Sequence, residues 1–189
     1  MTSLVRQVQA EHPERRIEVW AGDEHRLGLK PILRRVWARR GQQPIAVVWH
    51  RYQWLYLYGF VHPQTGATQW FLMPSVRIDI FSQVLAAFAH AVGAGPDKLV
   101  ILVVDRAGWH ISEHVQVPDG ILLVFLPPYS PELQPAECLW ALSNEPLVNR
   151  AVASLDELEA VPCQPCRALQ SEPDPIRART RFHWWPLIQ

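Results

Sequence analysis

The feature that most constrains the fold is an uninterrupted apolar run at residues 99–104, which ends directly in Asp105. A strand reads as a continuous apolar run when both faces of its sheet are covered, because neither face then meets water. A second run of this kind, at residues 121–126, ends in the irregular segment Pro127-Pro128-Tyr129-Ser130-Pro131. These two runs predict buried strands in a sheet that carries helices on both sides.

Four further segments have the residue types of strands. Residues 16–23 place Ile17, Val19, Ala21 and Asp23 on one face, so that a carboxylate follows three apolar side chains. Residues 45–49, 54–61 and 68–73 are rich in β-branched and aromatic residues, and a turn at residues 63–66 separates the last two. This pattern predicts an antiparallel meander after an irregular, exposed and basic segment at residues 30–41.

Helices are predicted from spacing and from end signals. Apolar residues recur at helical spacing between residues 78 and 92, and Gly93 follows where the helix should stop. A second helix should open near Pro135 and carry Glu137, because proline is favoured in a first turn. Residues 154–157 resemble a capping box for a further helix. Pro162 and Pro165 should end that helix early.

After the strand at residues 16–23, the order of these elements is three strands, a helix, two buried strands and then helices. It predicts an α/β fold of the ribonuclease H-like type, with a mixed β-sheet flanked by α-helices. A chain of 189 residues suits one such domain. We therefore expect a single catalytic domain over residues 1–189, in which residues 1–16 are a lead-in and residues 151–189 a helical tail.

Composition limits the class of protein. No stretch approaches the roughly 20 apolar residues of a membrane helix, and the first residues lack the apolar segment of a signal peptide. We therefore expect a cytoplasmic protein with no membrane partner. Three cysteines without an export signal argue against a disulfide framework, and we interpret Cys163 and Cys166 as ordinary thiols.

The net charge is zero, but its distribution is uneven. Between residues 24 and 40 there are six basic residues and one acidic residue, whereas residues 97–159 hold ten acids and three bases. A basic segment beside an acid-rich one suits a protein that binds phosphates with one surface and divalent cations with another. Solvated helix and loop faces are the alternative interpretation of each segment. The candidate DNA-binding residues are Arg26, Lys30, Arg34, Arg35, Arg39 and Arg40.

Three carboxylates are the candidate catalytic residues and metal ligands. Asp23 and Asp105 each end a predicted strand, and Glu137 begins a predicted helix. If the two strands are neighbours, the three side chains can converge at the carboxyl end of the sheet. Divalent ions held by such oxygen ligands can activate a water and stabilise a departing oxygen in phosphodiester cleavage.

Local sequence around these acids resembles a known family. The blocks are Val19-Trp-Ala-Gly-Asp23-Glu24-His25, Val103-Val-Asp105-Arg-Ala-Gly-Trp-His110 and Leu126-Pro-Pro-Tyr-Ser-Pro-Glu-Leu-Gln-Pro-Ala-Glu137-Cys-Leu-Trp140. Together they resemble the bacterial insertion-sequence transposases of the mariner-like DDE superfamily. The resemblance runs from about residue 17 to residues 181–184.

The resemblance implies an enzyme and its partners. It assigns Asp23, Asp105 and Glu137 as ligands of Mg²⁺ or Mn²⁺, with two ions, and Glu24 as a frequent second acid that is not a ligand. The implied reaction is strand cleavage at transposon ends followed by strand transfer to target DNA. Double-stranded DNA is the implied partner, with a homodimer as the active form and association with the bacterial nucleoid when DNA is bound.

Several features depart from the family pattern. Arg106 stands where an Asn commonly follows the second Asp, Gln134 replaces another usual Asn, and 31 residues separate Asp105 from Glu137, slightly fewer than usual. The amino-terminal helix-turn-helix of these transposases has no counterpart here. We therefore expect either a helix-turn-helix subunit from an adjacent reading frame or a truncated copy.

Three alternative functions remain open from the residues. The first is a catalytically impaired transposase remnant that acts only as a DNA- or protein-binding module. The second is a zinc peptidase, because residues 110–114 fit the pattern H-x-x-E-H, although residues 117–120 should end any helix there. The third is a stand-alone ribonuclease H or junction nuclease, which the segment at residues 127–131 disfavours.

Overall fold

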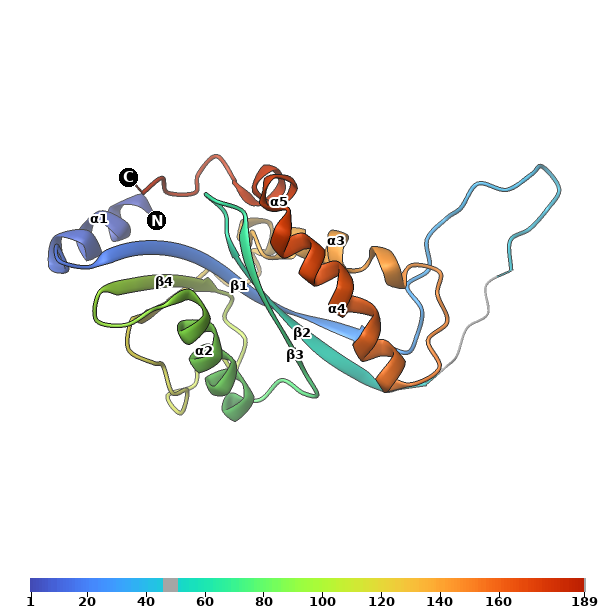
Figure 1. Cartoon of the computed structure of the whole chain (residues 1–189), viewed down its shortest axis with the longest axis horizontal. Coiled ribbons are helices and arrows are strands. Elements are labelled where there is room, and N and C mark those ends of the chain that lie inside the picture. Colours follow the sequence, from blue (N-terminus) through green and yellow to red (C-terminus); the bar gives the residue numbers. More distant parts are fainter. Residues whose placement is uncertain (46–50, 189) are drawn as a thin grey trace.

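The apolar runs lie in one mixed sheet. The computed structural model describes residues 1–45 and 51–188. Within these residues the sheet has five strands in the order β3-β2-β1-β4-β5 (Figure 1). The strands are β1 (Arg16–Gly28), β2 (Trp54–His62), β3 (Ala67–Met73), β4 (Lys98–Val104) and β5 (Ile121–Phe125). β1 pairs antiparallel with β2 and parallel with β4, so it joins the antiparallel half of the sheet to its parallel half.

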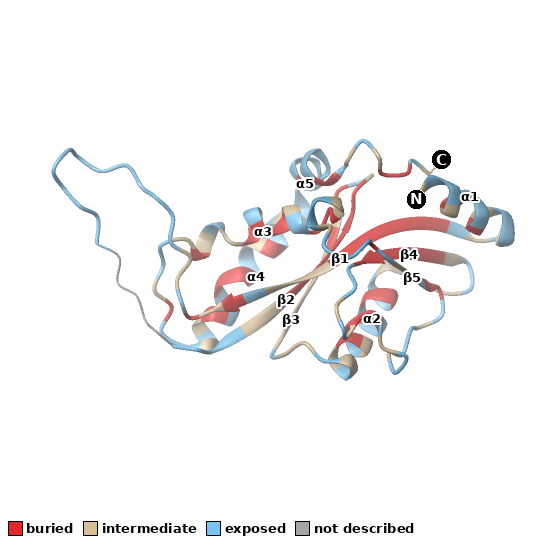
Figure 2. Ribbon diagram, turned by 180° about the vertical axis from the view of Figure 1, so that it is seen from behind, coloured by how far each residue is buried: buried red, intermediate tan, exposed pale blue. Residues whose placement is uncertain are grey.

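Helices cover both faces of this sheet (Figures 1 and 2). One face packs against α2 (Ile78–Val92), and the other against α3 (Glu137–Ser143), α4 (Leu155–Ser171) and α5 (Pro173–Thr180). A further helix, α1 (Thr2–Glu11), buries Val5 and Val8 in the hydrophobic core on the face of α3, α4 and α5. None of the helices in the described parts of the chain is long and apolar enough to cross a membrane.

The alternation of side chains along β1 and β4 separates the two cores. Ile17, Val19 and Ala21 pack with odd-numbered residues of β4 on the face of α3 and α4. Trp20 packs with even-numbered residues of β4 on the face of α2. Because successive strand residues point to opposite faces, Asp23 and Asp105 continue the first face, while Glu24 belongs to the second.

Local end signals explain why α2 stops where it does. Gly93 adopts a left-handed conformation with φ of 67°, and its N–H donates to the last turn of the helix. Glycine favours this conformation because it has no Cβ. The predicted helix at residues 78–92 is confirmed to its last residue.

Three predictions about the elements are wrong, and one predicted strand lies almost wholly outside the described residues. β1 continues beyond Asp23 to Gly28 because residues 23–28 pair with β2, so Asp23 lies within the strand and does not end it. α4 continues through Pro162 and Pro165 to Ser171, because its apolar side, including Leu158 and Cys166, is buried against the sheet and this packing outweighs the missing helix donors. β5 is an edge strand whose Phe125 is 37% exposed, so it is not covered on both faces. The strand predicted at residues 45–49 lies outside the described residues apart from Ile45.

The segment between β1 and β2 forms a long excursion, called the basic arm below (residues 29–45). It leaves the body of the protein as an irregular loop (Figure 1). Its root is fixed by a bridge between Ile32 and Val148 and by a hydrogen bond from the Arg34 backbone N–H to Asn149 Oδ1 (2.9 Å). Further out the arm is exposed, including the whole side chain of Trp37.

Candidate active site

The register of two neighbouring strands brings two of the candidate carboxylates together. β1 and β4 run parallel, and Ala21 pairs with Val103. Asp23 and Asp105 each lie two residues further along their chains and on the same face of the sheet. Asp23 and Asp105 are far apart in sequence, so only the pairing of these strands creates this proximity.

Glu137 lies near Asp23 and Asp105 but comes from the helix that follows the loop after β5. It is the first residue of α3, and residues 126–136 connect it to β5. Gln134 is buried in this connection, and its Nε2 donates to the carbonyl oxygen of Gly22 (2.9 Å). The loop is thereby fastened to β1 at the residue before Asp23. Gln134, which departs from the family pattern, therefore has a structural role that the sequence analysis did not identify.

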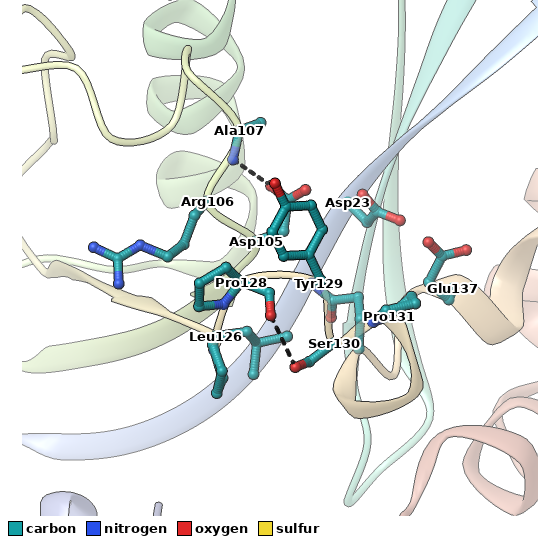
Figure 3. Close-up of a pocket in the computed structure, with 12 residues that line it drawn as sticks. Asp23, Asp105, Arg106, Ala107, Leu126, Pro128, Tyr129, Ser130, Pro131 and Glu137 are labelled. Carbon is teal, nitrogen blue, oxygen red and sulfur yellow. Dashed lines mark hydrogen bonds between the residues drawn. The ribbon is translucent and has the colours of Figure 1, made fainter.

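The three carboxylates line one cavity of about 370 Å³ (Figure 3). The loop after β5 supplies one wall, with Tyr129 in a left-handed conformation (φ of 56°) and its side chain fully exposed. Arg106 also borders the cavity, but its guanidinium group points away from the three carboxylates in Figure 3. The guanidinium group of Arg106 therefore does not neutralise the carboxylate of Asp105.

The carboxyl groups of Asp23 and Glu137 influence each other. Burial, and then the charges of Glu24 and Glu137, raise the pKa of Asp23 to about 7, although the Trp140 N–H opposes this effect. Burial also raises the pKa of Glu137, while a hydrogen bond with Asp23 acts in the opposite direction. Asp23 therefore holds a proton more readily than an ordinary aspartate and can donate it to the Glu137 carboxylate.

Trp140 packs beside Asp23 and orients it. Its Nε1–H donates to Asp23 Oδ2 (3.1 Å), and its ring stacks on His25 with 5.1 Å between ring centroids. Gly59, the partner of Asp23 on β2, makes room for this ring, because a Cβ there would lie 2.8 Å from Trp140. Trp140 stands in the third motif block, but its spacing alone did not reveal this contact.

His110 links two acids that belong to different motif blocks. Its Nδ1 lies 2.6 Å from Asp105 Oδ1, and its Nε2 lies 2.6 Å from Glu24 Oε1. Burial lowers the pKa of His110, but the hydrogen bonds and charges of Asp105 and Glu24 outweigh it and raise this pKa to about 9. Both ring nitrogens can therefore donate, and the bond from His110 holds the pKa of Asp105 below its ordinary value.

The donor set fits a hard divalent cation in chemical kind, because carboxylate oxygens are the ligands that Mg²⁺ and Mn²⁺ prefer. Burial, and to a smaller extent the charges of neighbouring carboxylates, raise the pKa values of Asp23 and Glu137. Within residues 1–45 and 51–188, however, no three or more His, Cys, Asp or Glu side chains are arranged so that they could hold a metal ion. The carboxylates thus share the cavity without a common point of convergence.

The geometry required of a zinc peptidase is missing at residues 110–114. This segment consists of turns and irregular backbone, so His110 and His114 do not lie one helical turn apart on a helix. His110 is buried between two acids, whereas His114 is exposed. The peptidase alternative therefore has no support from the structure.

The basic residues occupy the arm and the end of β1 beside it. The guanidinium group of Arg26 lies 5.0 Å from the centroid of the Trp54 ring, and Arg34 is paired with Glu145 (2.6 Å). Lys30, Arg35, Arg39 and Arg40 are exposed, and among the described residues they form no ion pair. These four cations are available to a polyanionic partner, whereas Arg34 would first have to exchange partners.

Comparison with known proteins places these features in context. A family model described as DDE superfamily endonuclease matches residues 18–159, a range that contains all three carboxylates. A protein of Sinorhizobium fredii (strain NBRC 101917 / NGR234), the uncharacterized protein y4pE/y4sA, is 33% identical over 132 residues, which are 69% of this chain and 96% of that protein.

Solved structures with the same architecture include those of Mos1. The Mos1 mariner paired end complex with Mn matches with a TM-score of 0.65 and 17% identity, and the Mos1 strand transfer complex with a TM-score of 0.56 and 16% identity. The alignments cover 95% and 97% of this chain but only 55% and 60% of the respective Mos1 chains. At this identity the likeness concerns the fold, and the predicted α/β, ribonuclease H-like class is confirmed.

Proposed function

Because this chain belongs to the DDE superfamily of endonucleases, we propose that it is the catalytic domain of a bacterial insertion-sequence transposase. It would cleave DNA strands at transposon ends and transfer them to target DNA. The observation that carries this proposal is the common cavity of Asp23, Asp105 and Glu137, which come from two adjacent parallel strands and the start of a helix. That arrangement joins the residues of all three motif blocks at one site.

The proposed chemistry assigns the three carboxylates to Mg²⁺ or Mn²⁺, with two ions as the expected number. Bound there, the ions would lower the pKa of the attacking hydroxyl and stabilise the departing oxygen. Asp23 has to release its proton for this role, and the approach of a cation would favour that release. Cleavage and strand transfer are both in-line displacements at phosphorus, so one set of carboxylates can serve a water in the first step and a DNA 3′-hydroxyl in the second.

The walls of the cavity would hold the substrate strand. Loop residues 127–131 contain three prolines, which restrict the backbone beside the carboxylates. Gln134 fastens the same loop to β1. Positioning of the scissile phosphate would therefore rely on a wall that loses little conformational entropy when DNA binds.

Double-stranded DNA is the proposed partner of the basic arm and its neighbours, through Arg26, Lys30, Arg34, Arg35, Arg39 and Arg40. Cations on an irregular loop can follow phosphates but have no fixed geometry for reading bases. Binding through these residues would give affinity without sequence preference. Recognition of the transposon ends is assigned to a helix-turn-helix subunit from an adjacent reading frame, and the active form is proposed to be a homodimer.

Neutralising the outer arm should weaken DNA binding uniformly. The triple variant Arg35→Gln, Arg39→Gln, Arg40→Gln is expected to bind every duplex less tightly. The slope of its log Kd against log salt concentration should also be smaller, by the amount that corresponds to a loss of about two to three phosphate contacts. Fluorescence anisotropy with duplexes of unrelated sequence measures both quantities. A triple variant with the same charge change at exposed sites elsewhere, Arg6→Gln, Arg167→Gln, Arg181→Gln, is the control. An equal loss in the control, or a loss confined to one DNA sequence, would contradict the assignment.

A remnant that binds DNA without cutting is the second candidate function. The observation that favours it is that the described side chains form no group ready to hold a metal ion. The chain also spans little more than half the length of the Mos1 chains it matches, so a complete transposition reaction is a proposal for an assembly and not for this chain alone.

The test of the proposed function is nicking of supercoiled plasmid by the full chain. We expect nicked product with Mn²⁺ and with Mg²⁺, and none with EDTA. If the chain binds the same DNA but nicks it with neither Mn²⁺ nor Mg²⁺, the proposed transposase activity is wrong and the DNA-binding remnant takes its place. Nicking that persists in EDTA would point to a different site.

A further inference from the structure

The buried side chain of His110, which links Asp105 to Glu24, has no role in the chemistry described above. The His110 side chain is 1% exposed, and that of Glu24 is 6% exposed, whereas Asp105 is half exposed toward the cavity. Burying a histidine and a glutamate is costly unless each finds a partner, and here they are partners of each other. The contact therefore joins a buried charge pair to a carboxylate that faces the cavity.

The ring of His110 is held in place from several sides. It packs against Phe81 of α2, with 4.4 Å between ring centroids, and edge-on against Trp109 at 5.9 Å. Glu24 comes from the face of β1 opposite to Asp23 and fixes the remaining ring nitrogen. A side chain packed in this way has one orientation, so the position of its Nδ1 is determined by the fold.

This orientation has a consequence for the two oxygens of Asp105. Oδ1 accepts from His110 Nδ1 at 2.6 Å and from the Ala107 backbone N–H at 3.0 Å. Both acceptor directions of that oxygen are thus occupied. Within the part of the chain that the structure describes, Oδ2 accepts no hydrogen bond. The carboxyl group therefore offers one free oxygen.

We propose that His110, itself oriented by Glu24, is a positioning residue that directs Oδ2 of Asp105 toward the divalent cation and restricts Asp105 to one-oxygen coordination. This inference rests on the proposed metal-dependent function. It also accounts for the acid next to Asp23, because Glu24 would act through His110 and not as a ligand. Hydrogen-bonded partners of ligating carboxylates commonly contribute to metal affinity in this way.

Mn²⁺ binding to the full chain, measured from the EPR signal of free Mn²⁺, tests the proposal without any measurement of catalysis. His110→Gln cannot donate to both acids, and we expect it to weaken Mn²⁺ binding about 10- to 100-fold. His114→Gln, four residues away and exposed, is the matched control and should bind as the parent does. Thermal unfolding in EDTA, measured alongside, separates lost stability from lost affinity.

A pair of variants that leaves His110 in place gives an independent result, should His110→Gln fail to fold. Glu24→Gln retains a hydrogen-bonding side chain for the ring and should keep affinity within about threefold, whereas Glu24→Ala should lose at least about tenfold. Equal Mn²⁺ affinity in the parent, His110→Gln and Glu24→Ala would overturn the proposal. A loss of similar size in Glu24→Gln and Glu24→Ala would also overturn it, because Glu24 would then act by its charge. A parent chain that binds no Mn²⁺ would overturn the metal-dependent function itself, and this inference with it.

Discussion

Each of the variants Asp23→Asn, Asp105→Asn and Glu137→Gln is expected to lose metal-dependent nicking by at least about 1,000-fold, which corresponds to about 4 kcal/mol of transition-state stabilisation. An amide has nearly the shape of the carboxyl group it replaces but carries no charge for a divalent cation. The three side chains line one cavity, so each loss should be nearly complete by itself. The measurement is the rate of plasmid nicking under saturating Mn²⁺.

The controls for this prediction lie on the same scaffold. Asp97 is exposed and directly precedes β4, at the opposite end of the strand from Asp105, and Glu159 is exposed on α4. Asp97→Asn and Glu159→Gln should nick at the parental rate. Circular dichroism should show that all five variants are folded. Undiminished nicking in any of the three cavity variants would remove that residue from the proposed ligand set, and undiminished nicking in all three would indicate a contaminating nuclease.

Asp23→Asn should also remove the loss of stability that the parent protein undergoes as the pH rises and Asp23 ionises. The pKa of Asp23 is about 7 in the folded protein, against an ordinary value of 3.8. The folded state therefore binds this proton more tightly than the unfolded chain does. The resulting stability is fully present below about pH 4 and is lost as the pH rises through about 7. An asparagine at this position has no proton to lose and can still accept the bond from Trp140.

We therefore expect Asp23→Asn to be more stable than the parent at about pH 8 in EDTA, by about 1 to 3 kcal/mol after allowance for partial exposure to solvent. The difference should shrink toward about pH 4. Urea denaturation at several pH values measures the free energy of unfolding, with Asp97→Asn as control. A difference that does not change with pH would show that ionisation of the buried Asp23 carboxyl group is not its cause.

Adding Mn²⁺ should make the parent more stable than Asp23→Asn, the reverse of the order expected in EDTA. Metal bound to the folded state stabilises it by mass action, and the parent should gain more from this effect than the variant that lacks a ligand. Parent and Asp23→Asn gaining equal stability from Mn²⁺ would argue against Asp23 as a ligand. The destabilisation without metal and the stabilisation with metal would thus have the same origin, the buried negative charge of Asp23.

Local pattern was sufficient for most elements of this protein. The spacing of apolar residues and the glycine that follows them predicted α2, and the continuous apolar run predicted β4 with Asp105 directly after it. These predictions hold because helix and strand periodicity, together with end signals, are properties of neighbouring residues. The same local evidence predicted that Asp23 shares a face with Ile17, Val19 and Ala21.

Other features depended on contacts between distant residues. Leu158 and Cys166 show no local sign that burial would carry α4 through two prolines, and nothing in residues 121–126 indicates that β5 lies at the edge of the sheet. His110 lies 86 residues from Glu24, and Trp140 lies 117 residues from Asp23, so neither contact follows from spacing. Local sequence was enough to place Asp105 directly after a strand and Glu137 at the start of a helix, but it did not show that β1 continues past Asp23 to Gly28. That β1 and β4 are parallel neighbours became visible only in the folded protein, because pairing between strands far apart in the chain is set by the packing of the whole sheet and not by either strand alone.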